Sequence, residues 1–288
     1  MPKKIIVTGA TGLIGKEVLP YLSDKGYEVY PISSHNQDDK SFHWLKCDLF
    51  DEVALKNVFS SIRPEFLINF AWITGGDYLT NPINYKYKDA GLNLLKIFKE
   101  NGGKRAIYAG TCFEYDLNHS LINEKDKINP KTIYANCKNE LNQNCKKYAI
   151  ENELSFGWGR IFYVFGHGEK SSRLTAGIIN ALKNNAEFNL SSPNNFLDYM
   201  YTKDIARAFV TFLESSYEGD LNICSGKGIF LKDYALKIQK ILGKSGLIKY
   251  DEEKTAILDF IGDNTKLKSL GFIQEYDIDS ALLEILKD

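Results

Sequence analysis

The sequence has few of the features that mark a metal site or a disulfide-stabilised fold. Its five cysteines are widely scattered, with no Cys-x-x-Cys pair and no histidine-rich segment beside them. This spacing does not supply a zinc ligand set, and an odd, dispersed set of cysteines is typical of reduced thiols in the cytoplasm. We therefore expect no bound metal. The cysteines are Cys47, Cys112, Cys137, Cys145 and Cys224.

Long apolar stretches and a strong charge of one sign are also missing. No uncharged apolar run approaches the roughly 20 residues that a membrane span needs, and the N-terminus enters a predicted strand directly. The formal net charge is -1, with acidic and basic residues mixed, which argues against the one-sided basic surface of a nucleic-acid-binding protein. These absences predict a cytoplasmic protein without membrane or nucleic-acid partners.

The segment Lys4–Gly15, KIIVTGATGLIG, joins a short apolar strand to a helix through three glycines spaced three residues apart. Such glycines allow a tight turn, close approach of the backbone to a pyrophosphate and close packing of the helix. The unpaired amides at the helix N-terminus then favour a phosphate. The pattern indicates a dinucleotide site, although a plain tight turn is the alternative. The cofactor-binding residues predicted here are Gly9, Thr11, Gly12, Leu13 and Ile14.

From residue 1 to about residue 165, apolar runs alternate with amphipathic stretches, which is the pattern of a parallel sheet with crossover helices. We predict an α/β fold, a doubly wound parallel sheet of the Rossmann type with a smaller C-terminal lobe that caps the substrate. Residues 1–165 and 196–225 are assigned to the dinucleotide-binding domain, and residues 166–195 and 226–288 to the substrate-binding lobe. Strands are predicted at 5–8, 28–33, 42–45, 66–71, 105–109 and 154–161, and helices at 13–25, 51–62, 84–101, 132–151, 172–184 and 203–215.

The end of the second predicted strand bears on the choice between NAD and NADP. Dinucleotide folds that prefer NAD usually place Asp or Glu there to bind the ribose 2′-hydroxyl, whereas this chain has Ser33 and Ser34. A carboxylate would repel a 2′-phosphate, so its absence favours NADP over NAD, with an ordinary polar turn as the alternative. After the third strand, Asp48 and Leu49 are candidates for binding the adenine; the alternative is a turn or helix cap.

Tyr134 and Lys138 lie four residues apart, which places both side chains on one face of a predicted helix. That helix is entered through Pro130, lies between the fifth and sixth strands, and follows Thr111 at the carboxyl end of the fifth strand. This setting singles out Tyr134. The same Tyr-x-x-x-Lys spacing also occurs at Tyr21, Tyr199 and Tyr250.

These three side chains suit proton transfer to a carbonyl. A tyrosine has a pKa of about 10, so its use near neutral pH asks for a shift of about 2 to 3 units. We expect the Lys138 ammonium and an oxidised nicotinamide to lower the pKa of Tyr134 by Coulomb attraction, while the Thr111 hydroxyl holds the substrate carbonyl. Thr111, Tyr134 and Lys138 are therefore the predicted catalytic residues. The alternative is a surface aromatic beside a solvated charge.

Together these motifs resemble the extended short-chain dehydrogenase/reductase family, which includes NAD-dependent epimerase/dehydratases that act on nucleotide sugars. The resemblance covers nearly the whole chain and implies that Thr111, Tyr134 and Lys138 form the catalytic triad. It also implies cofactor contacts from Phe70 and Ala71 on the adenosine side and from Ile161 and Phe162 near the nicotinamide. Its carriers are TGATGLIG at 8–15, CDL at 47–49, YAGTCFEY at 108–115, YANCK at 134–138, GRIFYVFG at 159–166 and LDYMYTKDIARAF at 197–209.

Departures from the family pattern narrow the reaction. In the 4,6-dehydratase branch the catalytic Thr is followed by Asp and Glu, where this chain has Cys112 and Phe113. In GDP-fucose synthase-like epimerase-reductases a Cys stands in the place of Phe113. A phenyl ring cannot abstract a proton, so the resemblance argues against dehydration and against epimerisation through an enolate. Cys112 is interpreted as a packed thiol.

The substrate side of the site is less well defined by the sequence. Tyr163 stands where many family members carry an Asn that holds the nucleotide diphosphate. Lys170 and Arg173 are candidates for binding phosphates, with solvated surface charges as the alternative. Trp72 follows the fourth strand and either lines the sugar pocket or packs.

The leading hypothesis is NAD(P)H-dependent reduction of a keto group, at C4, on a nucleotide-activated deoxyhexose used for surface polysaccharides. One alternative is a nucleotide-sugar 4-epimerase with tightly bound NAD, and another is a non-catalytic NADP-binding regulator. Family members often form dimers through the helices near 84–101 and 132–151. Because the second of these is very polar here, a homodimer is only weakly indicated.

Overall fold

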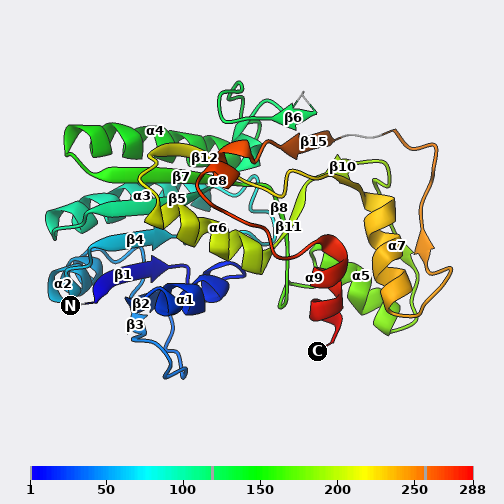
Figure 1. Cartoon of the computed structure of the whole chain (residues 1–288), viewed down its shortest axis with the longest axis horizontal. Helices are drawn as coiled ribbons and strands as arrows, with labels where there is room; N and C mark the ends of the chain where they lie inside the picture. Colours follow the sequence, from blue (N-terminus) through cyan, green and yellow to red (C-terminus); the bar gives the residue numbers. More distant parts are fainter. Residues whose placement is uncertain (1, 118–119, 256–257, 288) are drawn as a thin grey trace.

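The computed structural model describes residues 2–117, 120–255 and 258–287. Within them a seven-stranded sheet forms the centre, with all neighbouring strands parallel, in the order β12-β7-β5-β4-β1-β2-β3 (Figure 1). The strand order reverses between β1 and β4, where ligands of such sheets bind. The strands are β1 (Lys3–Thr8), β2 (Tyr27–Ser33), β3 (Leu45–Lys46), β4 (Phe66–Asn69), β5 (Arg105–Thr111), β7 (Ser155–Ile161) and β12 (Gly219–Ile223).

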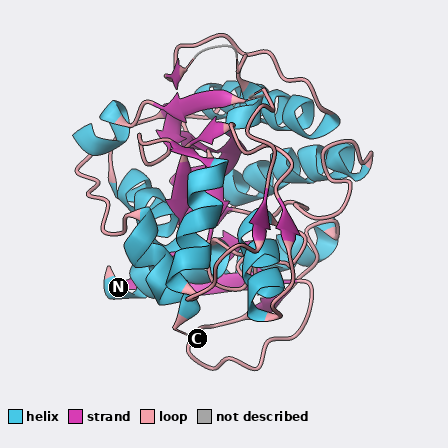
Figure 2. Ribbon diagram, turned by 90° about the vertical axis from the view of Figure 1, so that its right-hand side faces the viewer, coloured by secondary structure: helices cyan, strands magenta, loops and turns pink. Residues whose placement is uncertain are grey.

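Helices cover both faces of this sheet (Figure 2). Alternate residues of β1 belong to different cores: Ile5 and Val7 pack on one face, whereas Ile6 packs on the other. This alternation is expected of a strand buried on both sides. The predicted doubly wound α/β fold is thereby confirmed. One face carries α1 (Gly15–Asp24) and α6 (Thr202–Glu214), and the other carries α2 (Glu52–Ile62), α3 (Ile83–Glu100) and α4 (Ile133–Glu151).

A second core lies beyond the carboxyl edge of the sheet, in the region at the right of Figure 1. It is shared by α5 (Leu174–Lys183), α7 (Leu231–Ile241) and α9 (Ile278–Leu286). The division of the chain into two discontinuous domains stays a prediction. The remaining short elements are β6 (Leu121–Ile122), β8 (Tyr163–Phe165), β9 (Phe188–Asn189), β10 (Phe196–Leu197), β11 (Tyr199–Tyr201), β13 (Ile229–Phe230), β14 (Ile248–Lys249), β15 (Asp259–Gly262), α8 (Thr265–Ser269) and the 3-10 turn η1 (Cys112–Glu114).

The third strand differs from its predicted position at residues 42–45. Only Leu45 and Lys46 pair with β2. Phe42 and Trp44 instead pack against the core on the α1 side of the sheet. Their aromatic side chains produced the apolar pattern that suggested a strand, but they bury their surface without pairing their backbone.

The seventh strand, β12, was not predicted. Its sequence, Gly-Asp-Leu-Asn-Ile, interrupts the apolar pattern with two polar residues. In the fold Asp220 forms an ion pair with Arg160 (3.1 Å), and Asn222 accepts a hydrogen bond from Tyr115 (2.8 Å). These partners come from distant segments, so the strand is buried without an apolar sequence signal.

The strand register brings one end of the sheet together. Thr8 lies beside Asn69, Asn69 beside Tyr108, and Thr111 beside Ile161. The loops that follow β1, β4, β5 and β7 therefore leave the sheet at the same edge. The glycine loop and the predicted catalytic residues are in those loops and in the helix that follows.

The described residues show the state of the cysteines, the apolar character of the helices and the grouping of possible metal ligands. The five cysteines are buried as free thiols. No described helix is both long and apolar enough to cross a membrane. In the described part of the chain, no group of three or more His, Cys, Asp and Glu side chains is arranged to hold a metal ion.

Candidate active site

The glycine loop brings the backbone of three segments into close contact. Gly9 has a φ of +66°, and a Cβ there would lie 2.6 Å from the backbone of Phe70 and Ala71. A Cβ on Gly15 would lie 2.2 Å from the Gly9 carbonyl oxygen, to which the Gly12 amide donates (2.9 Å). Only glycine permits this packing. The first residues of α1, with no side-chain cap, therefore meet the edge of the sheet.

A cavity of about 350 Å³ opens in front of this loop. It is lined by the glycine loop, by residues at or just after the ends of β4 and β7, by the start of α5 and by β11. Its volume and its mixture of apolar walls and a few polar groups suit a small-molecule site. The predicted site residues that line it are Gly9, Gly12, Leu13, Ile14, Phe70, Trp72, Thr111, Tyr134, Lys138, Ile161, Phe162, Tyr163 and Arg173.

The three predicted catalytic residues all line this cavity and are almost fully buried. Thr111 is the last residue of β5, and Tyr134 and Lys138 lie in the first two turns of α4. The helix starts here because the Thr132 hydroxyl accepts a hydrogen bond from the Ala135 amide (3.1 Å). Local capping thus sets the position of both catalytic side chains relative to the strand edge.

Lys138 is a buried cation with aromatic and carbonyl neighbours. Its Nζ donates to the Ala109 carbonyl (2.7 Å) and lies 4.0 Å from the centre of the Trp72 ring. Burial lowers the pKa of Lys138 to about 7, against the opposing effect of the Glu114 carboxylate. Trp72 therefore both lines the cavity and stabilises the ammonium by a cation–π contact.

Tyr134 differs from the sequence-based expectation. Burial, followed by the neighbouring Tyr78, raises its pKa above the usual range, and contact with the Thr111 side chain only partly offsets this rise. The protein groups alone therefore do not lower the pKa of Tyr134, and the expected combined effect of Lys138 and an oxidised nicotinamide stays a prediction. The physical reason is that both groups are removed from water, and Lys138 directs its charge to Ala109 and Trp72. The phenol stays protonated, which suits a proton donor.

A sequence model of the NAD dependent epimerase/dehydratase family matches residues 5–224. This range includes the glycine loop and the predicted catalytic residues Thr111, Tyr134 and Lys138. The chain belongs to this family. It is an NAD(P)-dependent enzyme of the extended short-chain dehydrogenase/reductase type, and the resemblance inferred from the sequence motifs is confirmed.

Individual members of the family are similar over most of this chain. The dTDP-6-deoxy-L-talose 4-dehydrogenase (NAD(+)) of Aggregatibacter actinomycetemcomitans is 28% identical, over 77% of this chain and 84% of that protein. The GDP-L-colitose synthase of Yersinia pseudotuberculosis is 24% identical, over 97% of this chain and 95% of its own length. The UDP-N-acetylglucosamine 4-epimerase of Methanobrevibacter ruminantium M1, in complex with UDP-N-acetylmuramic acid, superposes with a TM-score of 0.89 at 23% identity, covering 99% of this chain and 97% of that one. This last likeness establishes the fold.

The residues around the glycine loop fit the dinucleotide of this family. The space that side chains at Gly9 and Gly15 would fill is already closed by backbone, so a phosphate would meet main-chain amides directly. Beyond the loop, apolar side chains of Phe70, Ile161 and Phe162 line the cavity. This combination of amides for phosphates and apolar walls for rings matches the chemistry of NAD(P).

We expect Gly15→Ala to weaken NADPH binding about tenfold or more. Its Cβ would collide with the Gly9 carbonyl and push the helix away from the strand, an overpacking of the kind that costs about 1 to 3 kcal/mol. Calorimetric titration with NADPH measures the change. Gly75→Ala is the matched control, because its Cβ would meet only the flexible end of Lys170. Equal affinity of Gly15→Ala and the native protein for NADPH would contradict the assignment of the glycine loop as the phosphate-binding site.

The residues after Thr111 are also placed unlike those of a dehydratase. Cys112 is buried, and this burial raises the pKa of its thiol well above the usual range. Phe113 lines the cavity. The structure thus presents a neutral thiol and a phenyl ring at the two positions where this family's dehydratases carry acids.

Seven predicted site residues do not line the cavity. Ser33 accepts hydrogen bonds from the His35 amide and the Gln37 side chain (both 3.1 Å), and Asp48 accepts from the Phe50 amide (2.9 Å) in a turn. These local bonds agree with the alternative of polar turns. The seven are Thr11, Ser33, Ser34, Asp48, Leu49, Ala71 and Lys170.

Two of these residues nevertheless lie close to the cavity. Ala71 adjoins the Gly9 backbone, and Lys170 lies beside Gly75. Arg173, which does line the cavity, donates to the Thr74 carbonyl (3.2 Å). The two cations therefore stand where the loop after β4 meets the start of α5.

The cavity also contains polar residues that were not predicted from the sequence. Glu169, beside Lys170, is the most unusual. Burial raises its pKa to about 7, against the opposing effects of Thr175, Arg173 and the Ala176 amide. Its Oε2 is buried without a hydrogen-bond partner within the described chain. No local sequence signal marks a buried carboxyl, although its neighbours Lys170 and Arg173 pointed to this segment. The others are Tyr78, Thr175 and Tyr199.

We expect Glu169→Gln to raise the melting temperature at pH 8. The pKa of the Glu169 carboxyl rises from 4.5 to about 7 on folding. The native protein therefore loses stability as the pH rises from 4.5 to 7, by on the order of 2 kcal/mol after allowing for partial exposure. The gain should become small near pH 4.5, where the folded carboxyl is protonated and the unfolded one is half protonated. Thermal melts from pH 4.5 to 8 test this, with the exposed Glu252→Gln as control. An unchanged or lower melting temperature at pH 8 would refute it.

Proposed function

We propose that this enzyme reduces a keto group on a nucleotide-activated deoxyhexose, at C4, with NADPH as the reductant. The observation that carries the proposal is that Thr111, Tyr134 and Lys138 line the same cavity as the glycine loop. The similarity to a dTDP-6-deoxy-L-talose 4-dehydrogenase supports both the substrate class and the carbon. A 4-keto-6-deoxyhexose linked to a nucleoside diphosphate is the expected substrate.

Each catalytic side chain has a role in this reaction. Thr111 Oγ1 accepts from the Phe113 amide (3.3 Å), so its O–H is left to hold the substrate carbonyl oxygen. Tyr134 donates its proton to that oxygen, and the Lys138 ammonium stabilises the tyrosinate left behind. The glycine loop, Phe70, Ile161 and Phe162 would hold the dinucleotide, which would supply the hydride when bound. One hydride and one proton convert the ketone into an alcohol.

Reduction agrees better with the site than dehydration does. Elimination of water needs acids beside the catalytic Thr, and Cys112 and Phe113 cannot supply them. The raised pKa of Tyr134 keeps its phenol protonated, which suits delivery of a proton. Epimerisation through an enolate is also disfavoured, because Phe113 has no thiol and burial keeps the Cys112 thiol neutral.

We propose NADP in preference to NAD, because no carboxylate follows β2 to repel a 2′-phosphate. The printed name of the talose relative specifies NAD(+), so the two coenzymes must be compared directly. We also propose a cytoplasmic location and a homodimer. On the substrate side, we propose Lys170 and Arg173 as phosphate-binding residues and Tyr163 as a substrate contact.

A screen of nucleoside diphosphate keto-sugars with NADPH and NADH tests the function, with NMR of the product. We expect consumption of one NADPH per ketone and a new C4 alcohol. Tightly bound NAD that survives desalting, together with substrate inversion without coenzyme consumption, would establish the 4-epimerase instead. Absence of turnover with every sugar, despite NADPH binding, would favour the non-catalytic regulator.

A further inference from the structure

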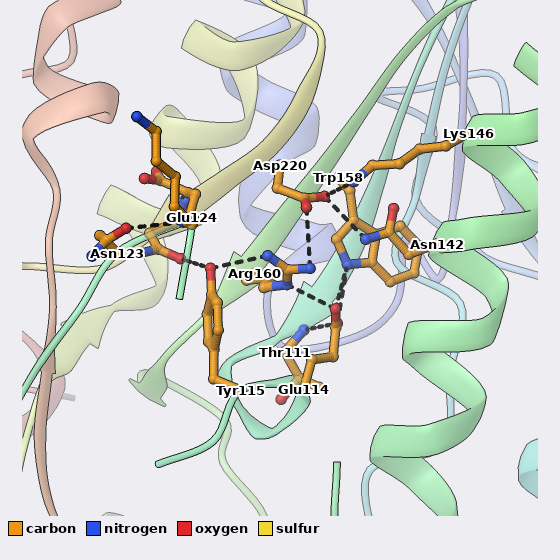
Figure 3. Close-up of polar contacts among 12 residues, drawn as sticks. Thr111, Glu114, Tyr115, Asn123, Glu124, Asn142, Lys146, Trp158, Arg160 and Asp220 are labelled. Atoms are coloured by element: carbon orange, nitrogen blue, oxygen red, sulfur yellow. Dashed lines mark hydrogen bonds and ion pairs between the residues drawn. The ribbon is translucent and has the colours of Figure 1, made fainter. Parts of the chain in front are cut away.

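A buried carboxylate stands directly behind the catalytic residues. Glu114, the last residue of η1, is fully buried and accepts four hydrogen bonds from three donors (Figure 3). The Thr111 amide donates to Oε1 (2.9 Å), and the Arg160 Nε to Oε2 (2.8 Å). The Trp158 indole contacts both oxygens (3.0 and 3.1 Å). Every donor around Glu114 suits an ionised acceptor.

The backbone leaves room for this group. A Cβ at Gly110 would lie 2.1 Å from the Trp158 indole nitrogen and 2.8 Å from Glu114 Oε1. The glycine before Thr111 is therefore required by the carboxylate behind it. The network continues from Arg160 to Asp220 (3.1 Å), which Lys146 also contacts (2.6 Å).

Glu114 makes one of the two hydrogen bonds that hold Thr111 in place. Its carboxylate accepts from the Thr111 amide, while the Thr111 hydroxyl oxygen accepts from the Phe113 amide. The two bonds fix both the backbone and the side chain of Thr111 at the end of β5. The hydroxyl proton is used in neither bond, and Thr111 lines the cavity.

Glu114 also carries a negative charge that acts on α4. The Lys138 ammonium lies 5.9 Å from the centre of the Trp158 ring, whose indole donates to Glu114. The carboxylate opposes the loss of the proton from this ammonium and disfavours ionisation of Tyr134. The other charged groups packed around Glu114 are Arg160 of β7 and, through it, Asp220 of β12. The remaining titratable neighbours are Cys112 and Tyr115, whose thiol and phenol are neutral because burial raises the pKa of each.

We propose that Glu114 is a positioning residue: it aims the Thr111 hydroxyl into the cavity and supplies the counter-charge that keeps Lys138 an ammonium ion. Its catalytic side rests on the proposed reductase function. The electrostatic side concerns the protein alone and holds for any reaction at this site. If Glu114 served only the fold, its substitution would have the same effect as a substitution elsewhere in the network, such as at Asp220. A positioning residue also changes the behaviour of Thr111 and Lys138.

The kinetic test compares Glu114→Gln with Asp220→Asn, which disturbs the same network without touching Thr111. The Gln side chain carries an NH₂ group in place of one carboxylate oxygen. That group cannot accept hydrogen bonds from the donors that surround Glu114. We expect Glu114→Gln to lower kcat about 100-fold with KM within about threefold, and to move the alkaline limb of the pH profile to lower pH. Asp220→Asn should keep kcat and the limb. Equal kinetic effects in the two variants would show a purely structural role.

The second measurement needs no substrate. In protein labelled with ¹⁵N-lysine, the Lys138 Nζ signal is assigned by its loss in Lys138→Arg, and its titration is followed by NMR. We expect the midpoint to fall by about one unit or more in Glu114→Gln and to stay in Asp220→Asn. An unmoved midpoint would overturn the electrostatic side even if the enzyme proves not to be a reductase.

Glu114→Asp covers the case in which Glu114→Gln does not fold. It keeps the negative charge but shortens the reach to the Thr111 amide. The expected result is a native-like Lys138 titration with a lowered kcat, which separates aim from charge. Native kcat in Glu114→Asp would refute the positioning of Thr111.

Discussion

Tyr134→Phe will lower the rate of carbonyl reduction by about 10² to 10⁴-fold, the range expected when a general acid is removed. Phenylalanine keeps the ring that packs edge-on against Tyr78 (5.0 Å between ring centres) and Trp72 (6.1 Å). Since the native phenol is uncharged, no ionic interaction is lost, and we expect the melting temperature to change little. Single-turnover reduction with NADPH and a keto-sugar measures the effect.

Tyr21→Phe is the matched control for this experiment. Tyr21 and Lys25 repeat the Tyr-x-x-x-Lys spacing on α1, but Tyr21 packs against the core under that helix and does not line the cavity. It should keep native activity. If Tyr134→Phe retains every measurable activity, the assignment of Tyr134 as proton donor is wrong and the non-catalytic regulator becomes the better hypothesis.

The parts of this site that depend on local sequence could be predicted. Gly9, Gly12 and Gly15 are read from one short segment, and the contacts of Gly12 and Gly15 are with Gly9 and Ala10 in that segment, although Gly9 itself meets Phe70 and Ala71. The shared helical face of Tyr134 and Lys138 follows from their spacing alone. The order of strands and helices likewise needs only the alternation of apolar and amphipathic stretches.

The parts that depend on distant partners could not be predicted. Glu114 meets Arg160 and Trp158 from 46 and 44 residues away, and nothing beside Glu114 in the sequence distinguishes it from an exposed acid. Asp220 and Asn222 hid β12 for the same reason, since the groups that satisfy them lie on other strands. Polar residues buried by long-range pairing leave no periodic pattern.

The raised pKa of Tyr134 in the protein alone could not be predicted for the same reason. A lysine four residues away on a helix suggests a lowered tyrosine pKa, because charge is visible in sequence whereas burial is not. In the fold both groups lose water, and this desolvation is the largest effect on the pKa of each. The catalytic pair is thus a neutral phenol and a lysine whose pKa burial lowers to about 7. The Glu114 carboxylate opposes that lowering.

Lys138→Met will abolish most of the activity and yet raise the melting temperature at pH 6 to 7. Burial lowers the pKa of Lys138 from 10.5 to about 7, so below pH 7 the folded protein holds a desolvated ammonium. A shift of this size corresponds to roughly 3 to 5 kcal/mol, or about 5 to 10 °C in a protein of this length. As pH rises from 7 toward 10.5, the folded state releases the proton first and the native protein gains stability. The advantage of the variant should therefore shrink over that window.

Thermal melts between pH 6 and 10 measure this difference, alongside reductase assays at each pH. Lys147→Met is the control on the same helix, because its ammonium is exposed and contacts Glu151 only at 4.0 Å; it should leave both activity and melting temperature close to native. A variant at Lys138 that is less stable than the native protein at every pH would show that the ammonium stabilises the fold, and the buried cation would then not be a group retained for catalysis at the expense of stability.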